Sequence, residues 1–290
     1  MTSLGALPAL WLAAAAGALG LVVGSFLNVV IHRLPREESI VRPRSHCPRC
    51  GRTLPAWENV PVLSYLWLRG RCRGCAERIS PRYPAIELLT GLVFAAIAWR
   101  HGAEALTPVW LAFAAALIAA AAIDFDHRII PDEISLGGLA LALVLVPGLT
   151  ALSGGSLGTA FGRCAGGALL GGGSLWLVGF THARLSVALG RRFEHWPGEG
   201  EVLPRPSSLD YWIWFPGLGF GDVKLLALVG AVLGPIGVLE TIVVASGVGL
   251  VGGGVFALLS RSWSTPFGFG PAIAAGALAV LIAPADFLLR

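Results

Sequence analysis

Eight apolar stretches, separated by polar segments, constrain the fold of this 290-residue chain more than any other feature. A helix needs about 20 mostly apolar residues to cross a bilayer, and the stretches are long enough, or nearly long enough, to do so. They cover residues 7–31, 85–99, 105–123, 134–152, 161–189, 223–233, 237–259 and 271–289. Only 13% of the residues are charged, against about 25% in soluble domains. The sequence therefore predicts an all-α polytopic membrane protein with about eight transmembrane helices.

The distribution of charge predicts the orientation of these helices. No Lys or Arg precedes the first stretch, whereas Arg33 and Arg36 follow it, and residues 32–84 hold 11 of the 20 arginines. Basic loops stay on the cytoplasmic side, so the N-terminus is expected outside and the first stretch is expected to be a retained anchor rather than a signal peptide. Alternating crossings then leave 17 arginines and Lys224 inside. Nucleic-acid binding is not expected, because no aromatic residues interleave a basic face.

Two aspartates occupy matching positions along the chain. Asp124 directly follows the third stretch, and Asp222 directly precedes the sixth, after the glycine-rich turn Gly219-Phe220-Gly221. The predicted orientation puts both at the cytoplasmic face at similar depth, without showing that they touch. A carboxylate at such a position is costly to keep and is by default a functional residue.

Two neighbouring carboxylates have a defined chemistry. Like charges cannot both ionise cheaply, so the pair shares a proton and supplies one base and one acid. The base takes a proton from water and the acid protonates the leaving amine, which hydrolyses a peptide bond without a metal or a covalent nucleophile. The chain contains neither an HExxH nor a GxSxG motif. Asp124 and Asp222 are therefore the predicted catalytic pair.

Structural roles stay open for several polar residues near this pair. Asp126 suits catalysis or a polar turn. Pro131 and Asp132 fit the start of the next helix, with Asp132 as its cap. Asp222 itself could be a helix N-cap. Lys224, the only lysine, either lowers the pKa of Asp222 or marks the cytoplasmic boundary.

Four cysteines form two CxxC pairs, Cys47 with Cys50 and Cys72 with Cys75. The spacing is that of a zinc ribbon, in which two tight turns present four thiolates to a tetrahedral ion. Disulfides, redox use and unliganded thiols are the alternatives, and the predicted cytoplasmic location, where thiols stay reduced, favours zinc. Four protein ligands close the coordination sphere, so the predicted zinc is structural and folds a segment too small to bury its own core. Cys164 is expected to be a packed core thiol.

In combination, these motifs resemble those of the type IV prepilin peptidases, the bifunctional leader peptidase and N-methyltransferase enzymes of pilus assembly and type II secretion. The resemblance covers nearly the whole chain. It includes segments 24–35, 58–72 and 79–91, both CxxC pairs and both aspartate motifs. The turn that ends in Asp222 has the GxGD form of this class of aspartic protease.

The resemblance implies an aspartic protease of the bacterial inner membrane, with eight helices and an active site facing the cytoplasm. It assigns catalysis to Asp124 and Asp222, and it favours Asp124 over Asp126 because the family's aspartate stands seven residues before the motif proline, here Pro131. The implied substrate is a prepilin or pseudopilin, cut after a glycine that follows a short basic leader. The new N-terminal residue would be methylated from S-adenosylmethionine, and the implied partners are the pilus or type II secretion machinery and the membrane lipids.

The sequence itself does not locate a site for S-adenosylmethionine, because no Rossmann-type GxGxxG opens a βαβ unit. The candidates lie in the N-terminal region: Asn28, Glu58 and Asn59, with Ser25 and His32 beside them. Asn28 could equally form an interhelical hydrogen bond.

The resemblance also divides the chain. Residues 1–31 form the first transmembrane helix, 32–84 a cytoplasmic four-cysteine domain associated with methyl transfer, and 85–290 the transmembrane protease domain. Within the last, the cytoplasmic insertion 190–218 is longer than the short linker usual in the family. Its aromatic stretch 211–215 suits an anchor at the membrane interface or a lid over substrate.

Three other functions are weighed against this one. A peptidase of the same fold could lack methyltransferase activity. A carboxylate-based transporter would place its aspartates near the bilayer midplane, with broken helices or repeats, whereas these two lie at the ends of apolar stretches. A zinc-stabilised assembly scaffold would not need the aspartates at all.

Overall fold

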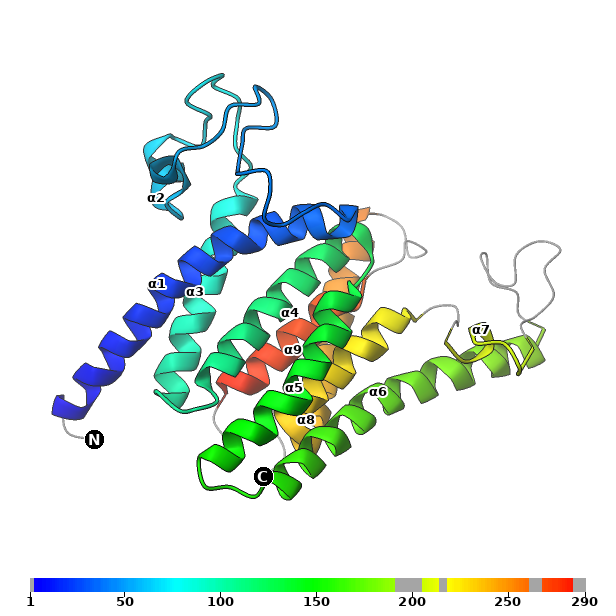
Figure 1. Ribbon diagram of the computed structural model, residues 1–290. Helices are drawn as coiled ribbons and strands as arrows, with labels where there is room; N and C mark the ends of the chain where they lie inside the picture. The colour runs from blue at the N-terminus through cyan, green and yellow to red at the C-terminus, as the bar shows by residue number, and fades with distance from the viewer. Residues whose placement is uncertain (1–2, 191–204, 214–217, 261–267, 284–290) are drawn as a thin grey trace. The chain divides into compact units, whose positions relative to one another are not determined.

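The computed structural model describes residues 3–190, 205–213, 218–260 and 268–283 (Figure 1). These residues are mainly helical, and among them there is no β-strand, only two isolated β-bridges. The all-α fold class predicted from the sequence is confirmed.

The described residues form two compact units, each described by itself. The first contains the described residues up to His127 together with the end of the last helix from Leu281, and the second runs from Arg128 to Val280. The long helices of the first unit are α1 (Ser3–Arg33), α3 (Arg82–His101) and α4 (Thr107–His127) (Figure 1). The second unit is built from α5 (Asp132–Leu152), α6 (Leu157–Ala188), α7 (Asp210–Ile213), α8 (Phe220–Ser260) and most of α9 (Gly270–Ile282).

Glycines bring the backbones of α1 and α3 into contact. A Cβ atom on Gly20 would lie 2.7 Å from the carbonyl oxygen of Thr90, and one on Gly24 would lie 2.7 Å from Cα of Glu87. Small residues allow the same close approach in many membrane helix pairs. The start of α3, which bears Arg82 and Glu87, is thereby held against the end of α1.

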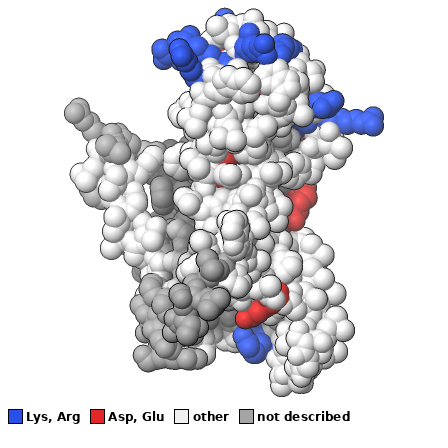
Figure 2. All heavy atoms as spheres, turned by 90° about the vertical axis from the view of Figure 1, so that its left-hand side faces the viewer, with Lys and Arg blue, Asp and Glu red and all other residues white. Residues whose placement is uncertain are grey.

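A polar segment of residues 34–81, here called the four-cysteine module, joins α1 to α3. It contains η1 (Leu34–Arg36), η2 (Ala56–Asn59) and α2 (Leu63–Trp67). Figure 2 shows basic side chains gathered at the top of the view, over this module. Its exposed arginines include Arg42, Arg44, Arg49, Arg69, Arg71, Arg73 and Arg78. The arginines concentrated in this part of the sequence therefore form a basic surface outside the apolar helices.

Helices α6 and α8 also meet through their backbones. A Cβ atom on Gly167 would lie 2.0 Å from the carbonyl oxygen of Gly230, and one on Gly171 would lie 2.4 Å from that of Leu226. Gly167 and Gly171 are one helical turn apart, so they form a groove along α6 into which α8 fits.

Helix α8 is not straight. Gly234 has a φ of 78°, outside the helical range, and Pro235 follows it. A Cβ atom on Gly171 would lie close to both Leu226 and Val238, although 12 residues of straight helix would separate those two by about 18 Å. The chain therefore folds back at Gly234, and the two halves of α8 carry the sixth and seventh predicted stretches (Figure 1).

Among the described residues, six helices are long and apolar enough to cross a membrane, namely α1, α3, α4, α5, α6 and α8, while α9 is apolar but shorter. The chain is thus a multi-pass membrane protein. Each of the eight predicted stretches coincides with helix, the last one up to the end of the described residues. The number of crossings and the domain boundaries at residues 31 and 84 stay predictions.

Helix ends differ from the prediction at three aspartates. Helix α4 continues to His127, so Asp124 lies inside the helix rather than just after it. Helix α5 has Pro131 as its N-cap, and Asp132 is its first helical residue rather than its cap. Asp222 is the third residue of α8 and not its N-cap. Partners from other helices stabilise these helical ends, and the local sequence does not reveal such partners.

Candidate functional site

The last turns of α4 carry two carboxylates in different surroundings. Asp124 is 5% exposed and belongs to the buried face of the helix. Asp126 is more exposed, and Arg82 from the first turn of α3 binds its carboxylate at 2.6 Å. Arg82 also donates a hydrogen bond of 3.1 Å to the carbonyl oxygen of Ala122. This pairing balances the charge of Asp126 and fixes the end of α4. Asp124 is left as the buried carboxylate of the first motif.

Asp222 lies in a turn that two glycines make compact. The Asp222 side chain is buried, and its backbone N–H donates to the carbonyl oxygen of Gly219 at 3.1 Å. A Cβ atom on Gly219 would lie 3.4 Å from Oδ2 of Asp222, and one on Gly221 would lie 3.1 Å from Cβ of Ile130. The glycines therefore leave room for the carboxylate on one side and for the segment before α5 on the other.

Lys224 lies one residue beyond Val223, and its ammonium group forms an ion pair with the carboxylate of Asp132 at the start of α5. The side chain also lies over the ring of Phe220, 5.6 Å from the ring centroid. Lys224 thus joins the first turns of α5 and α8. The structure thus gives Lys224 a contact between helices, and its two predicted roles, a partner for Asp222 and a boundary residue, stay predictions.

Asp124 belongs to the first unit and Asp222 to the second, so the structure gives the surroundings of each carboxylate within its own unit. Each is buried, and each sits in a turn or helix end fixed by its own set of contacts. The segment from Ile130 to Asp132 follows the first motif in sequence and packs against the second through Gly221 and Lys224.

The four cysteines predicted as metal ligands lie together. Their Sγ atoms are all within 4.8 Å of one another, and the Sγ atoms of Cys47 and Cys75 are 3.8 Å apart. Four sulfurs bound to zinc at about 2.3 Å stand about 3.8 Å apart at the corners of a tetrahedron, so the donor set and its spacing fit zinc. All are free thiols, as is Cys164, which is buried in α6 as expected of a core thiol.

The two CxxC pairs are built as the same turn. The N–H of Gly51 donates to the carbonyl oxygen of Cys47, and the N–H of Ala76 donates to that of Cys72, both at 2.9 Å. Gly51 and Ala76 occupy equivalent positions with φ of 69° and 57°. This left-handed conformation suits glycine and strains alanine. The repeated turn explains how two short segments present their thiols to one point.

Hydrogen bonding makes the thiols unequal. Backbone N–H groups of Cys75 and Gly74 aim at the Cys72 sulfur and lower its pKa to about 7. A backbone hydrogen bond from Glu77 lowers the pKa of Cys75, but desolvation and the neighbouring thiols outweigh it and raise that pKa to about 12. Four thiolates this close repel one another, so a bound cation is needed to keep all of them deprotonated.

Glu58, a predicted cofactor residue, is committed to the four-cysteine module. Its side chain is 1% exposed and forms two hydrogen bonds with Arg52, at 2.8 and 3.0 Å. Arg73 approaches the same carboxylate at 3.8 Å and covers the ring of Trp57. Arg52 follows the first CxxC pair and Arg73 lies inside the second. Glu58 therefore ties both cysteine turns to η2.

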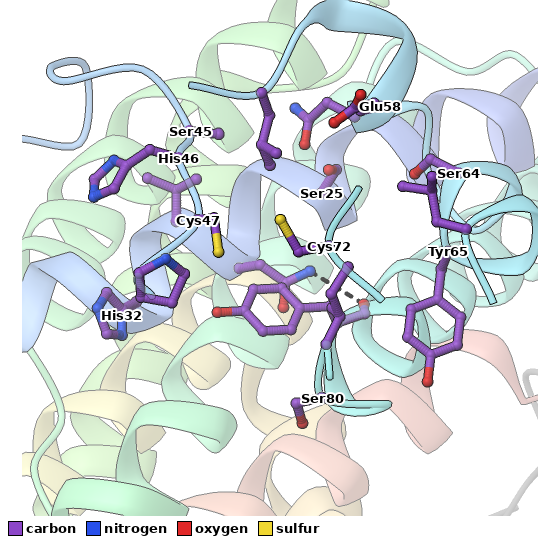
Figure 3. Close-up of a pocket in the computed structure, with 18 of the residues that line it drawn as sticks. Ser25, His32, Ser45, His46, Cys47, Glu58, Ser64, Tyr65, Cys72 and Ser80 are labelled. Carbon is purple, nitrogen blue, oxygen red and sulfur yellow. Dashed lines mark hydrogen bonds between the residues drawn. The ribbon is translucent and has the colours of Figure 1, made fainter. Parts of the chain in front are cut away.

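A pocket of about 620 Å³ lies between the end of α1, the four-cysteine module and the start of α3. Its volume is in the range of small-molecule sites. All five residues predicted for S-adenosylmethionine line it, together with Cys47 and Cys72. These are Ser25, Asn28, His32, Glu58 and Asn59. Figure 3 shows the sulfurs of Cys47 and Cys72 facing the middle of this pocket.

Some pocket residues are used to hold the structure together. The side-chain amide of Asn28 donates to the carbonyl oxygen of Tyr83 at 3.1 Å, which confirms the interhelical hydrogen bond considered for it. Glu87, which sequence reasoning did not single out, accepts a hydrogen bond of 2.7 Å from the N–H of Val62. A buried glutamate in an apolar helix is a signal that could have identified it.

The insertion at 190–218 is described in part. Residues 191–204 and 214–217, with Trp196 and Trp214, lie outside the described residues. Trp212 stacks on Phe180 of α6. The two roles considered for this insertion, an interfacial anchor and a substrate lid, stay predictions.

Two family models match the chain. Residues 18–101 match the bacterial peptidase A24 N-terminal domain, and residues 111–254 match the type IV leader peptidase family. The first match contains the four cysteines and the residues that line the pocket, and the second contains both Asp124 and Asp222.

Similar proteins cover most of the chain. The prepilin leader peptidase/N-methyltransferase of Pseudomonas putida is 36% identical over 91% of this chain and 88% of its own length. That of Neisseria gonorrhoeae is 34% identical over 89% of this chain and 86% of its own length. That of Myxococcus xanthus is 50% identical, over 50% of this chain and 44% of its own length. No solved structure matches the chain.

Proposed function

Because this chain belongs to the type IV leader peptidase family, we propose that it removes the basic leader of prepilins or pseudopilins and methylates the residue that the cut exposes. The observation that carries the peptidase half is the presence of two buried carboxylates, Asp124 and Asp222, within the matched residues 111–254. The names of the relatives and the pocket beside the four cysteines support the methyltransferase half.

Cleavage in this proposal uses Asp124 and Asp222 as a general base and a general acid. One carboxylate is ionised and takes a proton from water, while the other is protonated and passes its proton to the amine that leaves. Burial favours a shared proton, since two negative charges are costly in a low dielectric. Arg82 keeps Asp126 out of this chemistry by pairing with it.

Methyl transfer in this proposal takes place in the pocket of Figure 3. S-adenosylmethionine, when bound, supplies an electrophilic methyl group. Ser25 offers a hydroxyl and Asn59 an amide for its polar groups. An N-terminal ammonium must lose its proton before it accepts a methyl group, and His32 at the pocket wall is suited to take that proton.

Zinc has a structural role in this proposal. Four cysteine ligands leave no open coordination position, and the ion would fix the pocket wall to which Cys47 and Cys72 belong. The basic surface of the four-cysteine module supports a location on the cytoplasmic side of the bacterial inner membrane. In that location the enzyme would meet its substrates and the pilus or type II secretion machinery.

Cleavage of a prepilin by the purified protein tests the peptidase half. We expect Asp124→Ala and Asp222→Ala to abolish cleavage, and Asp126→Ala to keep much of it. Full cleavage by Asp222→Ala would overturn the peptidase assignment. Cleavage that is lost in Asp126→Ala but kept in Asp124→Ala would move the catalytic role to Asp126.

Transfer of a labelled methyl group to an already cleaved pilin peptide tests the other half. We expect the wild-type protein to methylate this peptide, and Asn59→Ala to reduce methylation while cleavage of an uncut prepilin continues. A wild-type protein that cleaves prepilin but transfers no methyl group would instead be a peptidase without methyltransferase activity.

A further inference from the structure

One face of α6 presents a row of large side chains to the chain segment that precedes α8. Trp176, Phe180 and Arg184 follow one another at intervals of four residues, so they lie on the same side of the helix. Tyr211 and Trp212, from the described residues 205–213 of the insertion, contact this row. Helix α6 has 32 residues, about 48 Å in length, which is more than the roughly 30 Å of a hydrocarbon layer.

The insertion is attached by stacked rings and hydrogen bonds. The Trp212 ring lies parallel to that of Phe180, with 5.4 Å between centroids and 4° between planes. The indole N–H of Trp176 donates to the carbonyl oxygen of Trp212 at 2.7 Å. Arg184 lies over the Tyr211 ring, 3.9 Å from its centroid, and donates to the Tyr211 carbonyl oxygen. These five residues are called the aromatic clamp.

The aromatic clamp shares its packing with the GxGD turn. Val223, which follows Asp222, is buried against Ala183 of α6. Leu218 and Phe220, on either side of Gly219, pack on the same cluster as Trp176 and Phe180. Leu218, Phe220 and Val223 therefore belong to the same apolar cluster as Trp176 and Phe180 of the aromatic clamp.

We propose that the aromatic clamp is a positioning element for Asp222. This inference rests on the proposed catalytic role of Asp222. Gly219 and Gly221 contribute no side-chain packing and leave the backbone of the turn permissive. Contacts with α5 and the segment before it hold one side of the turn, and Leu218, Phe220 and Val223 hold the side that faces α6. The clamp holds the surface on which these three residues pack, and through them Tyr211 and Trp212 support the position of the carboxylate.

Substitution of Trp212 tests this proposal. Because a displacement of about 1 Å can cost about 100-fold in rate, we expect Trp212→Ala to lower kcat for prepilin cleavage by roughly 10- to 100-fold with an unchanged KM. Methyl transfer to an already cleaved peptide should be unaffected, since the pocket for it lies in the first unit. Trp212→Phe, which keeps a stacking ring, should recover most of the cleavage rate.

A matched control is Leu209→Ala in the same segment, whose side chain is 71% exposed; it should cleave at the wild-type rate. Wild-type kcat in Trp212→Ala would overturn the proposal, as would a rise in KM alone, which would indicate a substrate contact. Parallel loss of methyl transfer would indicate general unfolding, in which case a second variant decides the proposal. If Trp212→Ala does not fold, Tyr211→Leu removes the ring under Arg184 and carries the same expectation.

Asp222→Asn, measured alongside, separates the two claims. Full cleavage by Asp222→Asn defeats the proposed function itself. Cleavage lost in Asp222→Asn but normal in Trp212→Ala defeats only the positioning role.

Discussion

The four-cysteine module and the helix pair α6–α8 are stabilised by opposite means. The module is held by a cluster of four sulfur atoms, with Cys47 and Cys72 buried and Cys50 and Cys75 exposed, and by the buried carboxylate of Glu58 with its arginines. Large apolar residues such as Trp67 are exposed. The helix pair has backbones in direct contact at Gly167 and Gly171. In the proposed function the module would depend on a bound zinc ion. The helix pair instead depends on glycines, whose lack of a side chain lets the two backbones touch.

Loss of one metal ligand should produce the largest difference between the two regions, because it should unfold the module and leave the helix pair intact. We expect Cys72→Ser to lose its bound zinc and the hydrogen-exchange protection of residues 46–79, because such small segments fold through their metal. Helices α6 and α8 should keep their protection. Metal analysis and hydrogen exchange measure both effects, with Cys164→Ser as the control thiol. A protected module without metal would contradict the comparison.

A single methyl group should test the helix pair. In Gly167→Ala the added Cβ would meet the Gly230 carbonyl oxygen at 2.0 Å, so the backbones must separate, at a cost of about 3 kcal/mol. Gly173→Ala, on the same helix, places its Cβ in open space and should change stability little. Thermal unfolding in detergent compares the two, and equal effects would show that the backbone contact is not what holds the pair.

The ion pairs of the module allow a finer comparison within it. Glu58→Gln weakens a buried bidentate pair and should cost about 2 kcal/mol, measured as faster loss of zinc to a chelator and lower unfolding temperature. Glu77 lies 3.9 Å from Arg49 with both side chains more than half exposed, so Glu77→Gln should have little effect. A similar loss in both variants would mean that burial does not decide the strength of these pairs.

The smallest expected change is a gain in stability. Ala76 adopts the left-handed conformation that Gly51 adopts in the equivalent turn, so Ala76→Gly should relieve about 1 kcal/mol of strain. The gain should appear as slower release of zinc. Gly51→Ala is the reciprocal variant and should speed the release. A neutral result in both would show that backbone strain in these turns is negligible.

The sequence predicted the parts of the molecule that depend on local composition. Apolar stretches locate the helices, and the CxxC spacing is enough to bring four thiols together. In the sequence, only the short sixth stretch and the Gly234-Pro235 pair after it indicate the fold-back at Gly234. Its direction depends on packing between α6 and α8, which no local pattern contains.

The candidate site was predictable where a motif carries it and not where distant residues build it. The resemblance to the family favoured Asp124 over Asp126, and the structure adds a physical reason, the pairing of Asp126 with Arg82, 44 residues away. The sequence offered candidate residues for the pocket but not the pocket itself, because its walls come from three segments that are separate in sequence. Glu58, a candidate for cofactor binding, lines the pocket and pairs with Arg52 and Arg73, contacts that no local pattern predicts.

The pairing of Lys224 with Asp132 means that chemical labelling of Lys224 can report on the contact between α5 and α8. Lys224 carries the only side-chain amine in the chain, its side chain is 17% exposed, and the ion pair holds it between α5 and α8. An amine-reactive label thus has a single side-chain target, two residues from Asp222. Slow labelling would record the closed contact between the two helices, and any substrate or inhibitor that separates them would be seen as faster labelling at one identifiable position.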